Sequence, residues 1–150
     1  MTSIKMRAAA VFATVLLCGT ALAQDGAQKL PVIRLNAGMH LIQAEFAQTP
    51  QEHGIGLMFR TTMAANEGML FAFSEAREQC FWMKNTLLPL SVAFVADDGS
   101  VVNIEDMKPQ TLDSHCSTRP VRYVLEMNLG WFAKRGIKAG TKLQGGPFSR

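Results

Sequence analysis

The chain is organised around the stretch Cys80-Phe81-Trp82-Met83-Lys84-Asn85-Thr86. Apolar and thiol side chains run directly into a lysine, an asparagine and a threonine, and Pro89 follows. If the stretch is a β-strand, its side chains alternate between two faces, so Trp82 and Lys84 share one face. Two interpretations stay open. The stretch either holds a small polar site on a rigid element, or it is an edge strand whose lysine is solvated and blunts the edge.

The beginning of the chain has the pattern of a secretory signal peptide. Lys5 and Arg7 precede an apolar run at residues 8–17, which is too short to span a bilayer, and Ala21-Leu22-Ala23 has the small-x-small pattern of a cleavage site. We therefore expect cleavage after Ala23 and a periplasmic or secreted protein without a membrane span. The alternative is a lipoprotein processed at Cys18, which the bulky residue at position 17 disfavours.

Charge and cysteine content narrow the partners and the compartment. The full chain has 15 basic and 12 acidic residues, and loss of residues 1–23 removes two basic residues and no acid, which leaves 13 against 12, or +1. No basic stripe remains, so nucleic acid is not expected as a partner. Cys80 and Cys116 remain as an even pair in an oxidising compartment. Because neither belongs to a C-x-x-C motif, a structural disulfide is favoured over a redox pair.

The rest of the chain predicts one domain that consists mainly of β-strands. Residues 24–29 are polar and small and are expected to be a disordered lead-in, and residues 30–150 form a single domain without repeats. Asp97-Asp98-Gly99 is the strongest hairpin signal. Strands are expected at 30–35, 39–46, 69–73, 80–86, 90–96, 101–107, 122–127 and 141–143. This spacing favours a small antiparallel β-sandwich or barrel with two short helices over a fold of alternating strands and helices.

The two helices are predicted from their end signals. Thr49-Pro50-Gln51-Glu52 combines an N-cap threonine, a proline at the first helical position and a glutamate three residues after the cap, and the helix is expected to continue towards Arg60. The second helix is expected at 129–135, capped by Asn128 and ended by Gly136.

No strong catalytic motif is present, and no metal or cofactor is expected. His40, His53 and His115 are scattered and are interpreted as isolated histidines. The methionines could ligate copper, but they are spread over the predicted elements, which favours a role in packing. The remaining candidates are polar residues where apolar segments end: Arg60, Lys84, Asn85, Thr86 and Glu126. A structural ion pair between Arg60 and Glu126 is the simpler alternative for two of them.

Several blocks resemble the signature of the domain of unknown function 192 family. In order, they are Gly56-Leu57-Met58-Phe59-Arg60, Gly68-Met69-Leu70-Phe71, Phe81 to Thr86 with Pro89-Leu90, and Val124-Leu125-Glu126 followed by Gly130. The resemblance covers residues 35–143 and implies a small β-sandwich of the jelly-roll kind in a single, often exported domain without an established activity. The chain departs from the family at Ser91, where an aspartate is common, and the cysteine pair is not general in the family.

Three functions stay open. The first is an exported domain that binds a small polar ligand, such as a saccharide or a cell-envelope fragment. Its expected ligand-binding residues are Arg60, Trp82, Lys84, Asn85, Thr86 and Glu126, with Trp82 stacking on a ring and the polar groups contacting anionic or hydroxyl groups. The second is an enzyme that processes envelope glycans or esters with Glu126 as acid or base. The third is a structural or assembly protein that contacts an envelope partner. Ligand identity and oligomeric state are not predicted.

Overall fold

The computed structural model describes residues 26–148. The predicted signal peptide at residues 1–23 lies outside the described residues. Within the described residues, no helix is long and apolar enough to cross a membrane. Gln28, in the expected lead-in, donates hydrogen bonds to the carbonyl oxygens of Glu52 and Gly56, at 2.8 Å and 3.0 Å. This part of the lead-in is therefore attached to the domain.

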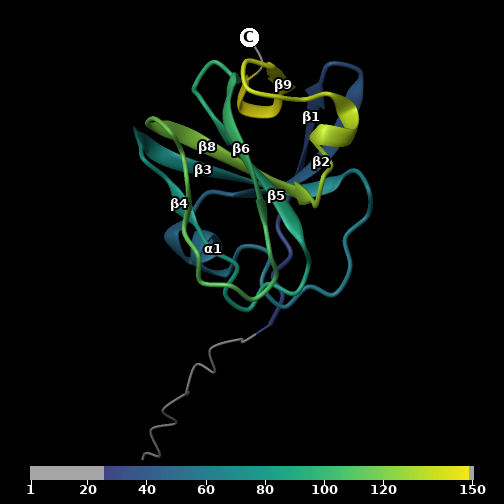
Figure 1. Cartoon of the computed structure of the whole chain (residues 1–150), viewed down its shortest axis with the longest axis vertical. Helices are drawn as coiled ribbons and strands as arrows, with labels where there is room; N and C mark the ends of the chain where they lie inside the picture. The colour runs from purple at the N-terminus through teal and green to yellow at the C-terminus, as the bar shows by residue number, and fades with distance from the viewer. Residues whose placement is uncertain (1–25, 149–150) are drawn as a thin grey trace, which may run out of the picture.

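The domain is mainly β, as the sequence predicts, but it is built on one curled sheet rather than on two packed sheets. The strands of this sheet, in the order β6-β5-β8-β3-β2-β1-β9, form a half-barrel (Figure 1). Their bounds are β1 Val32–Ala37, β2 His40–Ala47, β3 Glu67–Arg77, β5 Leu90–Val95, β6 Val101–Met107, β8 Val121–Asn128 and β9 Leu143–Gly145. The Asp97-Asp98-Gly99 hairpin is confirmed, because it joins β5 and β6 as an antiparallel pair.

The sheet is mixed, so the prediction of a purely antiparallel sheet is wrong. Strands β2 and β3 pair in parallel, from Gln43 opposite Glu67 to Ala47 opposite Phe71, whereas the other neighbours pair antiparallel. A parallel pair needs a long crossover connection, which here is the segment 48–66 that contains helix α1. The crossover packs against one face of the sheet and covers it.

The helices differ from the predicted pair. Helix α1 spans Pro50–Ile55, and the capping box at its start is confirmed, since Thr49 accepts from the Glu52 N–H and Glu52 accepts from the Thr49 N–H. It stops at Ile55 instead of continuing towards Arg60, because Gly56 has a φ of +49°. The second predicted helix is reduced to a 3₁₀ turn, η1 (Ala133–Arg135), and a further 3₁₀ turn, η2 (Gly146–Phe148), lies near the C-terminus.

Each face of the curled sheet carries its own buried cluster. The first face packs against the C-terminal segment, and its members include Leu70, Ala93, Leu125, Trp131, Phe132 and Ile137. The second face packs against the crossover and the loop after β4 (Cys80–Phe81), and its members include Leu57, Met69, Met83, Val92, Phe94 and Val124. Burial of aliphatic and aromatic side chains on both faces supplies most of the stabilisation of such a sheet.

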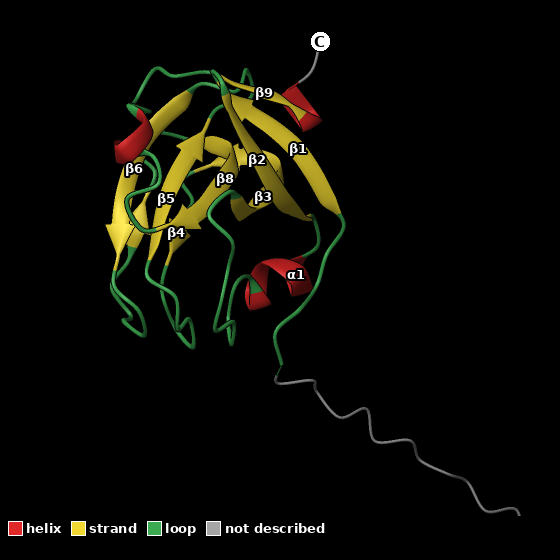
Figure 2. Cartoon of the chain, turned by 90° about the vertical axis from the view of Figure 1, so that its right-hand side faces the viewer, coloured by secondary structure: helices red, strands yellow, loops and turns green. Residues whose placement is uncertain are grey.

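The half-barrel is closed at one end and open at the other. The Val101 N–H donates to the Thr141 carbonyl and the Leu143 N–H donates to the Gly99 carbonyl, both at 2.9 Å, so the segment before β9 joins the start of β6. In both views, β9 lies at the opposite end of the molecule from α1 (Figures 1 and 2). At the α1 end, the loops that follow β4 and β6 meet each other and the crossover, through hydrogen bonds from the Gln110 N–H to the Thr86 carbonyl and from the Phe59 N–H to the Asn85 carbonyl.

Candidate functional site

Three glutamates lie in one row across the second face of the sheet. The strand register pairs Glu45 with Met69, Met69 with Glu126, Glu126 with Val92 and Val92 with Glu105. Residues paired in this way project from the same face. Because neighbouring strands are about 4.8 Å apart, the backbone of Glu126 lies about 10 Å from that of either other glutamate. The row spans β2, β3, β8, β5 and β6.

Glu45 is a buried carboxylate that is fully paired. Arg60 donates to its two oxygens, at 2.8 Å and 2.7 Å, the Leu30 N–H donates at 2.8 Å, and the Lys29 ammonium lies at 3.2 Å. Burial acts to raise the pKa of Glu45, but the hydrogen bonds from Arg60 and Leu30 and the two positive charges lower it below its ordinary value. Arg60 is therefore paired with Glu45, and not with Glu126 as the ion-pair alternative expected.

Glu126 is the contrasting carboxyl in the row. It is 4% exposed, and its side chain makes no hydrogen bond or ion pair with any residue between 26 and 148 that the structure describes. Burial alone raises its pKa to about 8. It faces a small cavity of about 40 Å³. The other residues that line this cavity are His53, Gly54, Ile55, Gly56, Leu57, Met58, Phe71, Phe81, Trp82 and Thr86.

The third glutamate and its neighbour have partners of their own. The Glu105 carboxylate lies 2.7 Å from Nδ1 of His115, at the edge of the second face. Asp106 projects to the opposite face, where it accepts a short hydrogen bond from the Ser91 hydroxyl, and the Ser91 oxygen accepts from the Gly130 N–H at 2.8 Å. A carboxylate on β6 therefore lies next to the position where the sequence has Ser91 in place of the expected aspartate.

Loops that include or contact residues of the cavity lining have a strained backbone. Phe59, Asn85 and Gln110 have φ values of +64°, +54° and +59°, and they are the non-glycine residues with positive φ in the described part of the chain. Their loops are joined by backbone hydrogen bonds from the Phe59 N–H to the Asn85 carbonyl, at 2.9 Å, and from the Gln110 N–H to the Thr86 carbonyl, at 3.1 Å. Such conformations persist only where the surroundings impose them, and they are concentrated at functional sites.

The stretch 80–86 is not one strand. Strand β4 ends at Phe81, and Lys84 and Asn85 form a turn, so the alternation expected over 80–86 is wrong beyond Phe81. Trp82 and Lys84 nevertheless lie together, with the Lys84 ammonium 5.5 Å from the centre of the Trp82 ring. Trp82 as a whole residue is 51% exposed.

The six predicted ligand-binding residues divide into three groups. Trp82, Thr86 and Glu126 line the cavity. Lys84 and Asn85 are exposed and lie in the turn between the lining residues Trp82 and Thr86, and Lys84 forms no ion pair with the described residues. Arg60 lies away from the cavity, and besides Glu45 it donates to the Gln28 carbonyl at 2.7 Å.

Sequence reasoning missed His53, which the structure places in the cavity wall. Its Nε2 lies 3.2 Å from the Ala47 carbonyl oxygen, and its ring packs 4.5 Å from that of Phe73. Its place in α1 is set by the Thr49 cap. The adjacent signal is Gly56, because an added Cβ there would lie 3.3 Å from the Phe71 ring, so the glycine allows the helix end to approach β3 closely.

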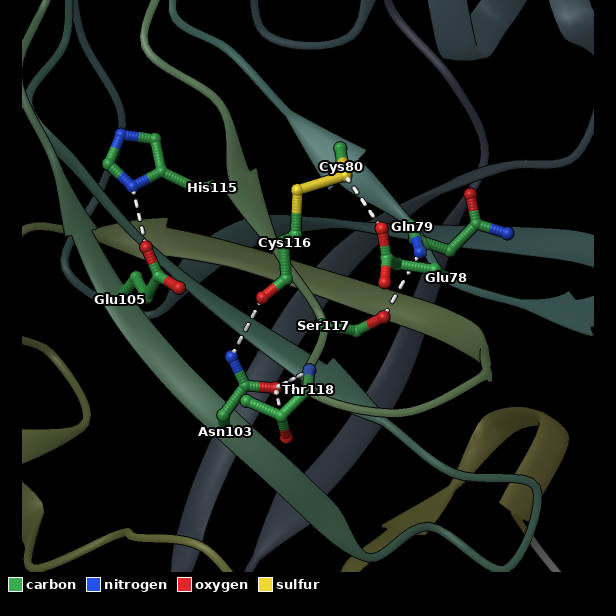
Figure 3. Close-up of a disulfide and its surroundings, with 9 residues drawn as sticks. All are labelled: Glu78, Gln79, Cys80, Asn103, Glu105, His115, Cys116, Ser117 and Thr118. Atoms are coloured by element: carbon green, nitrogen blue, oxygen red, sulfur yellow. Dashed lines mark hydrogen bonds and ion pairs between the residues drawn. A yellow bond between two sulfur atoms is a disulfide. The ribbon is translucent and has the colours of Figure 1, made fainter.

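The predicted disulfide between Cys80 and Cys116 is confirmed and joins β4 to β7 (His115–Cys116) (Figure 3). The two-stranded sheet is tied to β6, because the Asn103 amide donates to the Cys116 carbonyl at 3.0 Å. Figure 3 also shows Glu78, whose carboxylate lies 3.9 Å from the Cys80 sulfur. The disulfide removes the thiolates that a metal would need at this cluster. The disulfide directly precedes Phe81 and Trp82, which line the cavity.

Comparison with known proteins confirms the family that the signature blocks of the sequence indicated. Residues 32–145 match the model of the DUF192 family, which is described as an uncharacterized ACR. The chain belongs to this family. No curated protein matches it in sequence.

Two crystal structures resemble this DUF192 domain. One is a protein of Sinorhizobium meliloti 1021 that is provisionally described as a transcription regulator; it is 38% identical, with a TM-score of 0.76 over 81% of this chain and 99% of that chain. The other is a protein of unknown function from Novosphingobium aromaticivorans DSM 12444, 36% identical, with a TM-score of 0.70 over 83% of this chain and 90% of that chain. Both similarities cover at least 90% of the crystallised protein and about four fifths of this chain.

Proposed function

We propose that this domain binds a small polar ligand, such as a saccharide or a cell-envelope fragment, at the Glu126 cavity. The observation that supports the proposal is a buried carboxyl that lacks a partner among the described residues and faces a cavity. A buried polar group without a hydrogen bond destabilises the fold. A ligand that supplies the missing bond recovers this free energy on binding, which gives the cavity a physical reason to be occupied.

The cavity also restricts the part of the ligand that enters it. A volume of about 40 Å³ admits one or two heavy atoms, the size of a hydroxyl or hydroxymethyl group. With its pKa raised to about 8, the Glu126 carboxyl is largely protonated at neutral pH, so it both donates and accepts. This favours an uncharged polar group over an anion.

The rest of the ligand would lie outside, on Trp82. An exposed indole ring offers a flat surface on which the apolar face of a sugar ring stacks. Lys84 and Asn85 flank this surface and are available to the hydroxyl groups of a sugar. Arg60 is left out of the proposed site because Glu45 and the Gln28 carbonyl already occupy its guanidinium.

Catalysis is the second candidate, and it is favoured by the fact that His53 and Glu126 line the same cavity. A histidine and a protonated carboxyl are a usable base and acid. Glycosidases of the common kind need two carboxyl groups across the bond, however, and Glu105, the next carboxyl along the row, does not line the cavity and is paired with His115. Ligand binding therefore explains more of the geometry than hydrolysis does.

A thermal-shift screen of envelope sugars with matched variants tests the binding proposal. We expect a sugar that raises the melting temperature of the wild type to lose its effect in Glu126→Leu and to bind Trp82→Ala at least tenfold more weakly. Glu105→Gln is the control, because this carboxylate lies in the same row but does not line the cavity. An undiminished shift in Glu126→Leu, or equal losses in Glu126→Leu and Glu105→Gln, would contradict the proposed site. Release of a cleaved sugar would favour the enzyme.

We also propose that the protein is exported and cleaved after Ala23. Support comes from the small-x-small pattern and from the disulfide, because such bonds persist in oxidising compartments. The intact mass of protein recovered from the periplasm should correspond to residues 24–150. A mass that retains residues 1–23, or a lipid on Cys18, would refute this assignment.

A further inference from the structure

A second pocket, separate from the Glu126 cavity, lies where the loop before β3 meets the turn after β8. It has a volume of about 370 Å³ and is lined by Met63, Ala65, Asn128, Leu129, Trp131, Lys134 and Arg135. Asn128 holds its two sides together by donating to the carbonyl oxygens of Met63 and Ala64, at 3.4 Å and 2.9 Å. The pocket is therefore a fixed feature of two connected loops.

One wall of the pocket is a buried tryptophan with an unused donor. Trp131 is 3% exposed, and its indole Nε1 has no hydrogen-bond acceptor among the described residues. Among these residues, the Nε atom of Arg60 is the only other fully buried side-chain nitrogen in the same situation. Buried indole N–H groups normally have a partner. The pocket is therefore bounded by an indole ring that is held in the core without a hydrogen bond of its own.

The charged groups of the pocket are all positive. Lys134 and Arg135 have no carboxylate partner among the described residues, and the Arg135 guanidinium instead lies 4.3 Å from the centre of the Trp131 ring and donates to its carbonyl. No acidic residue occurs between 127 and 150. The nearby Glu67 carboxylate accepts from the Ala64 N–H and does not line the pocket.

The opposite side of the pocket is apolar. Met63 is half-buried, and the Leu129 side chain is 44% exposed although it follows directly after a buried strand. An aliphatic group that covered these two side chains would remove apolar surface from water. The pocket therefore suits a ligand with an anionic end and an apolar end.

We infer that this pocket binds a small organic anion, with its carboxylate or phosphate head between Lys134 and Arg135 and a short aliphatic body on Met63 and Leu129. Arginine and lysine suit such heads, because guanidinium pairs with two oxygens and ammonium acts as a point charge. The inference does not depend on the ligand proposed for the Glu126 cavity.

The two indole N–H signals of the protein allow a direct test. Trp82 and Trp131 each give one indole signal in a ¹⁵N–¹H correlation spectrum, so one reports on each site. We expect hexanoate or hexyl phosphate to shift the Trp131 signal saturably at millimolar concentration and to leave Trp82 in place. Hexan-1-ol, which has the same body without the charge, should bind at least tenfold more weakly.

Matched variants separate this site from general charge effects. Lys134→Gln with Arg135→Gln should weaken hexanoate at least tenfold, whereas Lys138→Gln, a cation of the same segment outside the pocket, should retain wild-type affinity within about twofold. Melting temperatures of the variants show whether each remains folded. Equal affinity for hexan-1-ol and hexanoate, an unmoved Trp131 signal with both anions, or an unchanged affinity in a folded double variant would overturn the inference.

Discussion

Glu45 and Glu126 lie on either side of Met69 in the same row of the sheet, both almost completely buried, yet their surroundings differ completely. Glu45 has two cations and a backbone N–H, and its pKa is lowered. Glu126 has none of these, and burial raises its pKa to about 8. Burial alone therefore does not determine the charge of a carboxyl, because the partners decide whether the ionised form is retained.

The difference also separates two uses of a buried acid. Glu45 fastens the segment before β1 and the end of the crossover to β2, through Leu30 and Arg60. Glu126 fastens nothing among the described residues, and its carboxyl remains available at the cavity. Substitutions that exchange these surroundings test whether the comparison is correct.

The largest effect is expected from Arg60→Met, which would remove the guanidinium from Glu45 and leave this carboxylate only the Leu30 N–H and the exposed Lys29. Loss of one partner from a buried ion pair costs about 3–5 kcal/mol of unfolding free energy, because the remaining charge is left without compensation. Urea denaturation at pH 7 measures the loss. The double variant Arg60→Met with Glu45→Met should recover most of it. A single variant as stable as the wild type would show that the pair is not needed.

Glu126→Gln should change how stability depends on pH. The folded pKa of about 8 lies above the ordinary value of 4.5, so the folded state retains this proton, and the stability contributed by Glu126 is complete below pH 4.5 and lost as pH rises through 8. Over that interval, the variant should gain on the wild type by about 1.4 kcal/mol per pH unit, on the order of 3 kcal/mol by pH 7.

Glu45→Gln provides the opposite sign for the same measurement. Because the folded pKa of Glu45 is lowered, its stabilisation is present above 4.5 and is lost as pH falls through the folded pKa. The deficit of this variant should therefore be largest at neutral pH and shrink in acid. Parallel pH profiles for the two variants would contradict the assigned difference between the carboxyls.

Lys29→Met should have a small effect although Lys29 also contacts Glu45. Its side chain is 78% exposed, whereas that of Arg60 is 10% exposed, so water already screens the lysine charge. We expect a loss of no more than about 1 kcal/mol of unfolding free energy. A loss as large as that of Arg60→Met would contradict the assignment of Arg60 as the main cation that lowers the pKa of Glu45.

The smallest change in stability is expected from Lys84→Met. Lys84 has no carboxylate partner in residues 26–148, and its contact with the Trp82 ring is exposed, so the unfolding free energy should change by about 0.5 kcal/mol or less. Any sugar found in the screen should bind this variant at least tenfold more weakly. A strongly lowered melting temperature with unchanged sugar affinity would instead make Lys84 a structural residue.

The sequence predicted those parts of the structure that depend on contacts between residues close together in the chain. The capping box at Thr49 and the turn at Asp97-Asp98-Gly99 formed as predicted, because both depend on contacts within a few residues. The pairing of Cys80 with Cys116 followed from their being the remaining pair. The helix expected at 129–135 failed locally, since Gly130 adopts a φ of +73° and only the last turn is helical.

Long-range register could not be predicted in this way. The partner of Arg60 is Glu45, which belongs to no recognisable block, and the two meet only because the crossover returns the chain parallel to β2. The same register places Glu126 next to Met69 and brings α1, with His53, over the cavity. Alternation of side chains along single strands contains no information about which strands become neighbours.

The pairing of β1 with β9 has a consequence for the order in which the domain folds. Leu35 near one end of the domain pairs with Gly145 near the other, so the sheet acquires its last strand only after almost the whole chain is available. Contacts between such distant residues slow folding, because the chain between them must be ordered first. Until β9 arrives, the open edge of β1 is a template for other chains, so newly made protein is exposed to aggregation for longer than a domain built from local hairpins.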